Sequence, residues 1–498
     1  MEELRNPIIL ASLAIYMAAC IGFGLWALRR THSARDFFMA GRNLGVFVAG
    51  MAVFSSTLSG FAFVGGPGLV YAMGMSSVWI VISSAIGFTI SFSLLAKRLR
   101  LFAQARDTIS LPDAVAARYR SEASRFLTAL AILLGVMGYL ATQILAMAMV
   151  LQSILERSAG FGDTSMVACV AISAAVLIFY CVTGGIIASV YTDLLQGTVM
   201  VVSSLLVFAT ALFAIDGGAA GAVAVLHADD PESIGPWGTL GMMGCLSWFF
   251  MFAVGGVGQP HVVTKYMMNK NVRDARRILP VSIISYTISA LLWISIGLVM
   301  RALVLQGAHP ALATADAAAP AFLQAYAHPV LAGVVFAGLF AAIMSTADSF
   351  LNIGAAAIVH DIPRAFRGRS LMRELYWARI ATVAIGVAAA AFALYSHYMN
   401  ARLIALLGAF GWGTFAAALV PTVAIGFNWK RASALAANVA IAVSLIVNFW
   451  IELFDIEIPH GIHGGTIAMI LSIVLFFGIS LLSQQPKLDP DIEAVMDV

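Results

Sequence analysis

The stretch Val53–Gly68, VFSSTLSGFAFVGGPG, is apolar enough to lie in a membrane, yet it carries residues that interrupt a helix. Its hydroxyl side chains stand just before Gly60, and a Gly-Gly-Pro-Gly run follows at 65–68. Backbone groups in hydrocarbon must be hydrogen-bonded, so a helix broken at this depth has to line a protein cavity. A second stretch of this kind, MFAVGGVGQPHVV, occupies residues 251–263. The positions of these two predicted broken helices suggest how the rest of the chain is divided.

The composition places the chain in a membrane. Of its 498 residues 61% are hydrophobic and 11% are charged, whereas soluble domains average about 25% charged residues. We predict thirteen membrane-spanning helices, each near the required length of about 20 residues. They cover roughly 7–28, 44–70, 76–96, 123–155, 164–183, 187–214, 238–262, 279–304, 329–358, 374–396, 400–426, 432–453 and 464–483. Only TGGIIA separates the fifth from the sixth, so this pair is the weakest part of the count.

The positive charges predict the orientation. If the N-terminus is outside, the inner loops and their flanks hold 24 of the 28 Lys and Arg residues. An excess of Lys and Arg in cytoplasmic loops is the rule for membrane proteins. The sequence therefore predicts an outer N-terminus and an inner C-terminus. The inner segments are 29–43, 97–122, 263–278, 359–373, 427–431 and the tail from 484.

The two broken helices lie five spans apart, which suggests two five-span halves at 44–214 and 238–426. An odd number of spans per half places the second half upside down relative to the first. Inverted repeats with leading helices broken near the midplane are typical of one large transporter architecture. The alternative is that Gly, Ser and Pro only allow close helix packing. The rest of this single transmembrane domain is an extra helix at 7–28, two C-terminal helices within 432–483 and a short inner tail, 484–498.

Polar residues gather in the ninth span, in AAIMSTADSF at 341–350. Ser345, Asp348 and Ser349 share one helix face. An Asp at the centre of a membrane helix costs about 2.5–3.5 kcal/mol, so it faces a cavity, forms a pair or holds a cation. Asp193, at the inner end of the sixth span, is the other clear membrane acid. The alternative is that both acids only cap or bridge helices.

The chain has no HExxH, GxSxG or GxxxxGK[ST] motif. The sequence therefore does not predict an enzyme, nor a pump that carries its own ATP-hydrolysing motor. His261 and His360 are single histidines next to predicted inner loops. We expect them at helix ends or in solvent rather than at a metal.

Five motifs resemble those of the sodium/solute symporters, and they occur in that family's order. The resemblance covers nearly the whole chain, and GQPH and AAIMST are closest to the proline and pantothenate branches. It implies an all-α integral membrane protein of the inner (plasma) membrane, with ten of thirteen helices forming the inverted-repeat core of the leucine-transporter fold. The motifs are ARDFFMAGRNLG (34–45), GGPGLVYAMG (65–74), GGIIASVYTDLLQG (184–197), GQPHVVTKYM (258–267) and AAIMSTADSFLN (341–352).

The resemblance also implies a Na⁺ site between the first core helix and the ninth span. Its ligands would be the main-chain carbonyls of Ser55, Leu58 and Ala342 with the hydroxyls of Ser345 and Thr346. Na⁺ is a hard cation that prefers oxygen ligands, and a helix break frees carbonyls to serve it.

Some relatives use a second Na⁺ site further inward. The candidates for it here are Asp193, Asp348 and Ser349. Asp348 stands where those relatives often have Ser, so the second site is a hypothesis for this chain.

The substrate pocket departs from the proline carriers. The aromatic pair of those carriers is replaced here by Phe252 and Gly256, and we expect the glycine to leave room for a larger or differently shaped solute. An acid near their first helix break is replaced by Thr57. Because the pocket spans hold no buried Arg or Lys in this prediction, an anionic group would bind backbone N–H groups at the breaks. The candidate substrate residues are Ser59, Gly60, Tyr139, Phe252, Gly256 and Pro260.

We therefore expect a Na⁺-coupled secondary symporter that imports a small organic solute, such as an amino acid or a small carboxylate, by alternating access. Its partners would be Na⁺, the solute and membrane lipid, with no nucleic acid and no obligatory protein partner. Two alternatives stay open. One is a membrane sensor that works with a separate signalling partner, and the other is a proton-coupled carrier that uses Asp348.

Overall fold

The computed structural model describes residues 2–29, 33–39, 44–156, 165–400 and 403–498. Part of the first motif (40–43) and four basic residues of the charge count, Arg30, Arg42, Arg157 and Arg402, lie outside these residues. The described chain is mainly α-helical. Its α-helices are α1 (Glu2–Leu28), α2 (Ala34–Met39), α3 (Val46–Thr57), α4 (Gly66–Met73), α5 (Val78–Ser91), α6 (Lys97–Arg106), α7 (Leu111–Tyr119), α8 (Glu122–Leu155), α9 (Met166–Phe213), α10 (Gly218–Asp229), α11 (Gly241–Phe249), α12 (Pro260–Tyr266), α13 (Ala275–Leu305), α14 (Ala318–Tyr326), α15 (Pro329–Ala356), α16 (Ile362–Arg367), α17 (Glu374–Tyr395), α18 (Ile404–Leu419), α19 (Ala434–Leu453), α20 (Gly464–Leu482) and α21 (Pro490–Met496).

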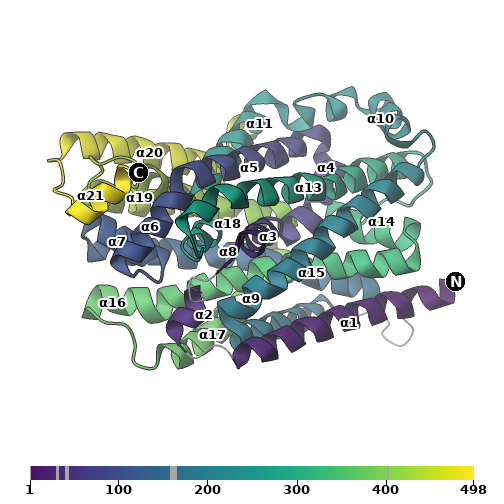
Figure 1. Ribbon diagram of the computed structural model, residues 1–498. Helices are drawn as coiled ribbons and strands as arrows, with labels where there is room; N and C mark the ends of the chain where they lie inside the picture. The colour runs from purple at the N-terminus through teal and green to yellow at the C-terminus, as the bar shows by residue number, and fades with distance from the viewer. Residues whose placement is uncertain (1, 30–32, 40–43, 157–164, 401–402) are drawn as a thin grey trace.

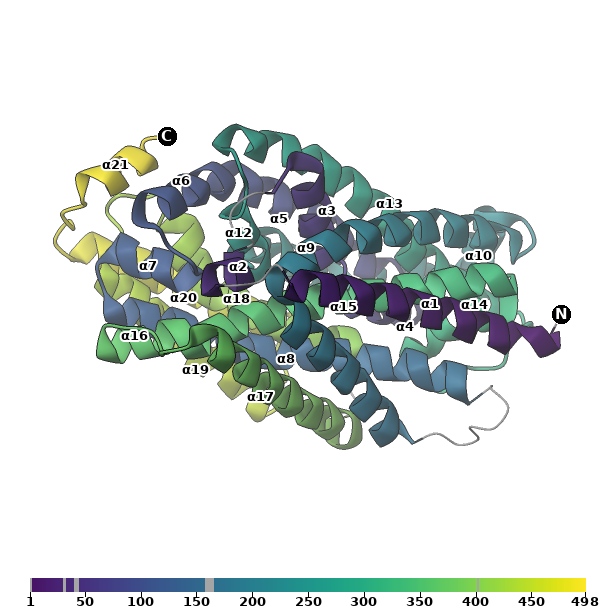
Figure 2. The same cartoon turned by 60° about the horizontal axis from the view of Figure 1, so that its bottom comes forward.

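Long helices run side by side through the molecule, and the two termini lie at opposite ends of the bundle (Figures 1 and 2). Helices α7, α16 and α21 lie at the end nearer the C-terminus, whereas α10 and α14 lie at the end that carries the N-terminus. Three of the segments that were predicted to be inner, those that contain α7, α16 and α21, thus share one end of the bundle. Which end faces the cytoplasm stays a prediction.

Twelve stretches of the described chain are long and apolar enough to cross a membrane, against the thirteen that we predicted. The difference arises at the second and third predicted spans. Val46–Thr57 is a short apolar helix by itself, and Phe61–Arg106 forms one helical run of 46 residues. The chain turns within this run at Gly74, whose φ is +61°. The break in the second span therefore decides how the spans are counted.

Helix α9 contains the fifth and sixth predicted spans and bends back on itself. A straight helix would place Tyr180 and Thr192 about 18 Å apart at a rise of 1.5 Å per residue. Instead, the two side-chain hydroxyls are hydrogen-bonded. The two legs, Met166–Thr183 and Ser189–Phe213, each have the length and hydropathy of a membrane span. The short TGGIIA segment thus lies at the bend between two spans.

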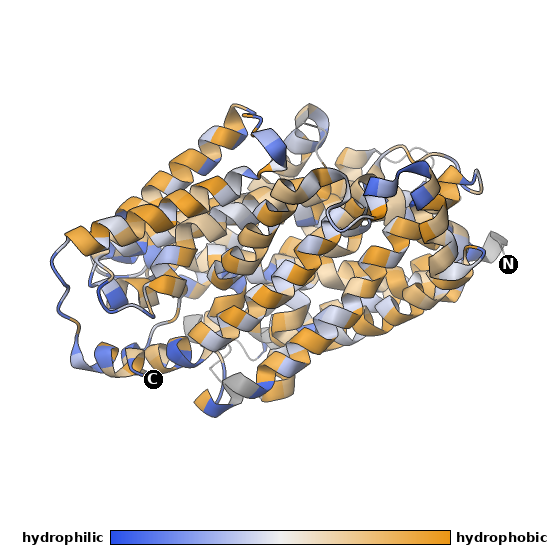
Figure 3. Cartoon of the chain, turned by 90° about the horizontal axis from the view of Figure 1, so that it is seen from above, coloured by the Kyte–Doolittle hydropathy of each residue, from blue (hydrophilic) through white to orange (hydrophobic). Residues whose placement is uncertain are grey.

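The apolar residues extend over the outer faces of the bundle as well as its interior (Figure 3). Val387 on α17, Ile446 on α19 and Val474 on α20 are each more than half exposed. A soluble protein rarely exposes apolar surface in such amounts. These faces are suited to lipid, and the chain is a multi-pass integral membrane protein.

The C-terminal tail folds back onto the bundle. The Arg106 guanidinium contacts Asp491 at 2.6 Å and Asp489 at 2.5 Å. Lys430 contacts Glu493 at 3.0 Å. These contacts are exposed, so each contributes little to stability, but together they place α21 against the bundle.

Candidate functional site

The first broken helix ends at Thr57 and resumes at Phe61 as the short π-helical segment η2 (Phe61–Gly65), which leads into α4. Leu58 between them is extended, with φ −100° and ψ 102°. In an unbroken helix the Ala62 N–H would donate to the Leu58 carbonyl. Here it donates to the Ser59 carbonyl at 2.9 Å. The break therefore releases the Leu58 carbonyl from the helical hydrogen-bond pattern, as the sequence predicted.

Two hydroxyls of α15 lie directly against this break. The Ser345 hydroxyl is 2.8 Å from the Ser55 carbonyl oxygen and 3.1 Å from that of Ala342. The Thr346 hydroxyl is 3.2 Å from the carbonyl oxygens of both Ser56 and Ala342. All of these residues are buried. The structure thus brings four of the five predicted Na⁺ ligands together, and it adds the Ser56 carbonyl.

This group, which we call the neutral cluster, consists of Ser55, Ser56, Ala342, Ser345 and Thr346, with Leu58 at its edge. All of the oxygens in it belong to carbonyls and hydroxyls. A hydroxyl can rotate to present a lone pair instead of its proton. The neutral cluster can therefore solvate a hard monovalent cation without a formal charge of its own.

One turn further along α15 lies a second group built around Asp348. Its Oδ1 accepts a hydrogen bond from Ser189 Oγ at 2.9 Å and lies 3.3 Å from Ser349 Oγ. Ser349 Oγ is in turn 3.2 Å from Ser56 Oγ. Asp348 is 1% exposed, and its Oδ2 has no hydrogen-bond partner among the described residues.

Lys265 completes this second group, and the sequence analysis missed it. We predicted that the seventh span ends at 262, that Lys265 belongs to an inner loop and that the pocket spans lack a buried Lys. Instead, α12 continues to Tyr266, and Lys265 is 3% exposed. Its Nζ lies 2.9 Å from Asp193 Oδ2, donates to the Ala52 carbonyl at 2.8 Å and contacts Ser56 Oγ. We call Asp193, Lys265, Asp348 and Ser349, with Ser56, the charged cluster.

Two of the predicted substrate residues meet beside the first break. Ser59 Oγ and Tyr139 Oη are 3.1 Å apart. The Gly60 N–H donates to Gln143 Oε1 at 2.8 Å, and the Phe61 N–H donates to Ser59 Oγ at 3.1 Å. Two of the N–H groups that we expected to bind an anionic substrate, those at the first break, are therefore already held by side chains of the protein. An anionic group would have to displace Gln143 or Ser59 to reach them.

The second break carries the other predicted substrate residues. Phe252 lies in the π-helical segment η7 (Phe250–Val254), and Pro260 begins α12. The Phe252 ring packs against Phe61, with centroids 5.9 Å apart, and against Trp412 at 5.2 Å. Phe61 also stacks on Tyr139 at 6.5 Å. Aromatic rings thus connect the two breaks.

Gly256 does not open the space that we expected from the sequence. A Cβ atom at Gly256 would lie 3.3 Å from the Cα of Gly87 on α5. The missing side chain therefore allows close backbone packing rather than a larger pocket. The expectation of room at this position is wrong in this structure.

His261 lies at the beginning of α12, one of the two positions that we predicted, but it is buried rather than solvated. It is 2% exposed, and its ring lies 4.6 Å from that of Phe350. Its Nδ1 has no hydrogen-bond partner among the described residues, and the same holds for Gln259 Oε1 and Trp293 Nε1. Buried polar atoms are normally hydrogen-bonded. These three atoms surround the aromatic residues between the breaks and are suited to contact a polar solute.

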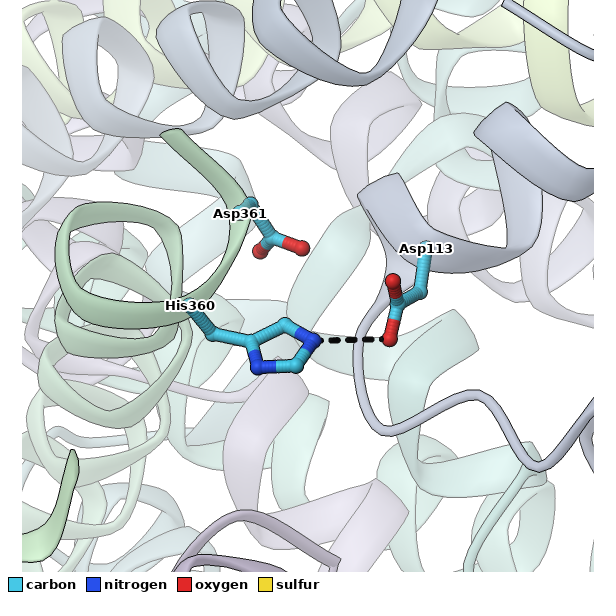
Figure 4. Close-up of side chains that lie close together, drawn as sticks. All are labelled: Asp113, His360 and Asp361. Carbon is cyan, nitrogen blue, oxygen red and sulfur yellow. Dashed lines mark hydrogen bonds and ion pairs between the residues drawn. The ribbon is translucent and has the colours of Figure 1, made fainter. Parts of the chain in front are cut away.

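A third buried group lies at the predicted inner end of α15. Asp113, His360 and Asp361 face one another there (Figure 4). Both ring nitrogens of His360 are engaged, Nε2 with Asp113 at 2.9 Å and Nδ1 with Glu374 at 2.8 Å, and Arg125 is bonded to Asp113. Burial alone would raise the pKa of Asp113, but the hydrogen bond with His360 and the charge of Arg125 hold it below its usual value. We interpret this group as an ion-pair network rather than a metal site, because the histidine nitrogens and a carboxylate are already taken.

Three comparisons relate the chain to known proteins. The model of the sodium:solute symporter family matches residues 37–443. The chain is 30% identical to the sodium/proline symporter of Escherichia coli strain K12, over 96% of this chain and 94% of that protein. It is 27% identical to the osmoregulated proline transporter of Bacillus subtilis strain 168, over 96% of this chain and 95% of that protein.

A solved structure shares the fold. A Na⁺-coupled sialic acid symporter in a substrate-bound outward-open state matches with a TM-score of 0.80 and 20% identity, covering 96% of this chain and 98% of the other. At this identity the likeness establishes the fold alone.

Proposed function

Because the chain belongs to the sodium:solute symporter family, we propose that it imports a small organic solute together with Na⁺ by alternating access. Family and relatives are transporters and not enzymes. The observation that carries the proposal is the neutral cluster, where hydroxyls of α15 meet the broken end of α3. The chain would work in the plasma membrane, where the Na⁺ gradient is available as a driving force.

Na⁺ at the neutral cluster would link the two parts of the fold that move in transport. Ser345 and Thr346 belong to α15, and Ser55 and Leu58 belong to the first broken helix. A cation bound between them would favour the conformation in which these helices are in contact. Each Na⁺ that enters at −100 mV supplies about 2.3 kcal/mol, which is enough to concentrate a solute against its gradient.

The solute would bind between the two breaks, near Ser59, Tyr139 and Phe252. The region is aromatic and offers neutral polar atoms, including those of Gln259 and His261. Because the Gly60 and Phe61 N–H groups of the first break are already capped by Gln143 and Ser59, we favour a small neutral or zwitterionic solute such as an amino acid over a simple carboxylate.

The test is Na⁺ binding to the purified chain. Ser345→Ala and Thr346→Ala each remove one ligand oxygen, so we expect the Na⁺ concentration for half-maximal thermal stabilisation to rise at least tenfold. Thr382→Ala is the matched control, because its hydroxyl donates only to the Ala378 carbonyl of its own helix. If both α15 variants keep the wild-type Na⁺ dependence, the site is wrong.

Proton coupling is the second candidate function. It is favoured by Oδ2 of buried Asp348, which has no hydrogen-bond partner in the described part of the chain. Proteoliposomes with a pH gradient in Na⁺-free buffer separate the two functions once a transported solute is found. Uptake that is equally fast without Na⁺ would support proton coupling.

A further inference from the structure

The charged cluster holds a cation that belongs to the protein. Lys265 Nζ has three oxygen neighbours, which are Asp193 Oδ2 at 2.9 Å, the Ala52 carbonyl at 2.8 Å and Ser56 Oγ. These come from α9 and α3, while Lys265 comes from α12. A carboxylate, a carbonyl and a hydroxyl around one positive charge are the ligands that a small hard cation would take. The ammonium group therefore sits in a cation site built from three helices.

This ammonium belongs to the same hydrogen-bonded group as the residues that the sequence suggested for a second ion site. Ser56 Oγ, which Lys265 contacts, is 3.2 Å from Ser349 Oγ, and Ser349 Oγ is 3.3 Å from Asp348 Oδ1. Asp193, Asp348 and Ser349, the three residues predicted for a second Na⁺, thus all belong to one hydrogen-bonded group with Lys265. The side chains of Asp193 and Lys265 are 0% and 3% exposed. Little water can therefore solvate either charge, and each charge is compensated by the other.

We propose that Lys265 is a tethered cation that takes the place of a second Na⁺, so that this chain binds one Na⁺ per transport cycle, at the neutral cluster. This inference rests on the proposed function and adds its ion stoichiometry. The ammonium neutralises Asp193, and a second Na⁺ next to it would meet both the positive charge and an already occupied set of oxygens. Removal of the ammonium should leave a vacant, negatively charged site that Na⁺ can enter.

Equilibrium binding of ²²Na⁺ to the purified full-length chain tests this stoichiometry without a known substrate. We expect the wild type to saturate at about one Na⁺ per chain, and Lys265→Gln to saturate at about two, a twofold rise in amplitude. Lys265→Arg is the matched control that keeps the charge, and it should stay at one. Lys265→Gln with Asp193→Asn should return to one, because the vacated position has then lost the carboxylate that Lys265 contacts.

If Lys265→Gln does not fold, a chain that keeps Lys265 but lacks the neutral cluster also decides the question. The Ser345→Ala, Thr346→Ala double variant of the wild type should bind no Na⁺, since the neutral cluster is then disabled and the other site is filled by Lys265. One Na⁺ remaining in that variant would overturn the proposal, and so would two in the wild type or one in a folded Lys265→Gln chain. A wild type that binds no Na⁺ would instead refute the proposed function itself.

Discussion

The neutral and charged clusters lie on successive turns of α15 and share Ser56, yet they are built on different principles. The neutral cluster offers only carbonyl and hydroxyl oxygens from α3 and α15. The charged cluster pairs Asp193 with Lys265 across α9 and α12. A neutral set of oxygens is suited to an ion that comes and goes, because it carries no charge when the ion leaves. A buried ion pair is neutral by itself and needs no ion from solution.

The comparison shows why proximity alone does not define an ion site. Both clusters contain residues that a family resemblance assigns to Na⁺, but only the neutral one lacks a protein cation. The following predictions test this contrast, from the largest expected effect to the smallest.

The largest effect is expected when the ion pair loses one partner. Asp193→Asn leaves the Lys265 ammonium buried without a counter-charge, and a broken buried pair costs about 3–5 kcal/mol. We expect a marked fall in the free energy of unfolding, measured by thermal or chemical denaturation in detergent. Asp193→Asn with Lys265→Gln removes both charges and should recover part of the loss. Wild-type stability in the single variant would show that the pair does not hold the cluster together.

The next prediction concerns Asp316, a buried carboxyl that no cation of the described chain neutralises. Removing this charge should raise the stability of the fold, whereas removing the charge of Asp193 should lower it. Asp316, in the loop before α14, is 4% exposed and accepts a hydrogen bond from the Ile404 N–H at 2.8 Å, while its Oδ1 has no partner among the described residues. Burial raises the pKa of Asp316 from 3.8 to about 7, although the backbone hydrogen bond lowers it in part. The folded chain therefore favours the neutral acid.

The direction in which stability changes with pH follows from the different pKa values of Asp316 in the folded and unfolded chain. Between pH 4 and pH 7 the folded state holds a proton that the unfolded state has lost, so stability falls as the pH rises through this window. One pKa unit corresponds to about 1.4 kcal/mol, which sets an upper bound of about 4 kcal/mol. Asp316→Asn should melt like the wild type at pH 4 and at a higher temperature than the wild type at pH 8. Parallel Tm profiles of the two chains would contradict this assignment.

The next largest effect is expected from a substitution of Gly60, where the helices pack closely at the first break. A Cβ at Gly60 would lie 2.7 Å from Ala146 Cβ and 3.0 Å from Ile343 Cγ1. Gly60→Ala should therefore cost about 1–3 kcal/mol of stability and should weaken Na⁺ binding by displacing the break from α15. Gly478→Ala on α20 is the control, since its Cβ would meet no atom within 4 Å. The prediction is wrong if the two variants are equally stable and bind Na⁺ alike.

The smallest effect concerns the substrate side of the break. Tyr139→Phe removes the hydrogen bond to Ser59, which is worth about 0.5–1.5 kcal/mol, so substrate affinity should fall by about 2- to 10-fold while Na⁺ binding stays unchanged. Tyr266→Phe removes a similar bond, between Tyr266 Oη and Ser91 Oγ at 3.1 Å. That control should leave substrate affinity unchanged, and a loss of Na⁺ binding in Tyr139→Phe would show that the two sites are not separate.

The sequence by itself determined the membrane class and the two broken helices, whereas the meeting of α3 with α15 was expected only from the family resemblance. Hydropathy and helix-breaking residues are local properties, so they can be read along the chain without knowing the fold. The predicted ligands Ser345 and Thr346 follow from the same local pattern, combined with a family resemblance. The span count was less secure, because the break at Leu58 divides one predicted span into pieces that a length criterion treats differently.

Only the tertiary structure decided the contacts between distant segments. The sequence placed Lys265 in an inner loop. Its neighbours along the chain do not indicate that it would be buried in an ion pair with Asp193, 72 positions away. Gly256 meets Gly87 rather than a substrate, and Gln143 and Ser59 cap the helix that was predicted to bind an anion. Charge pairing and close packing depend on which helices lie side by side, and that arrangement is a property of the folded chain rather than of any one of its segments.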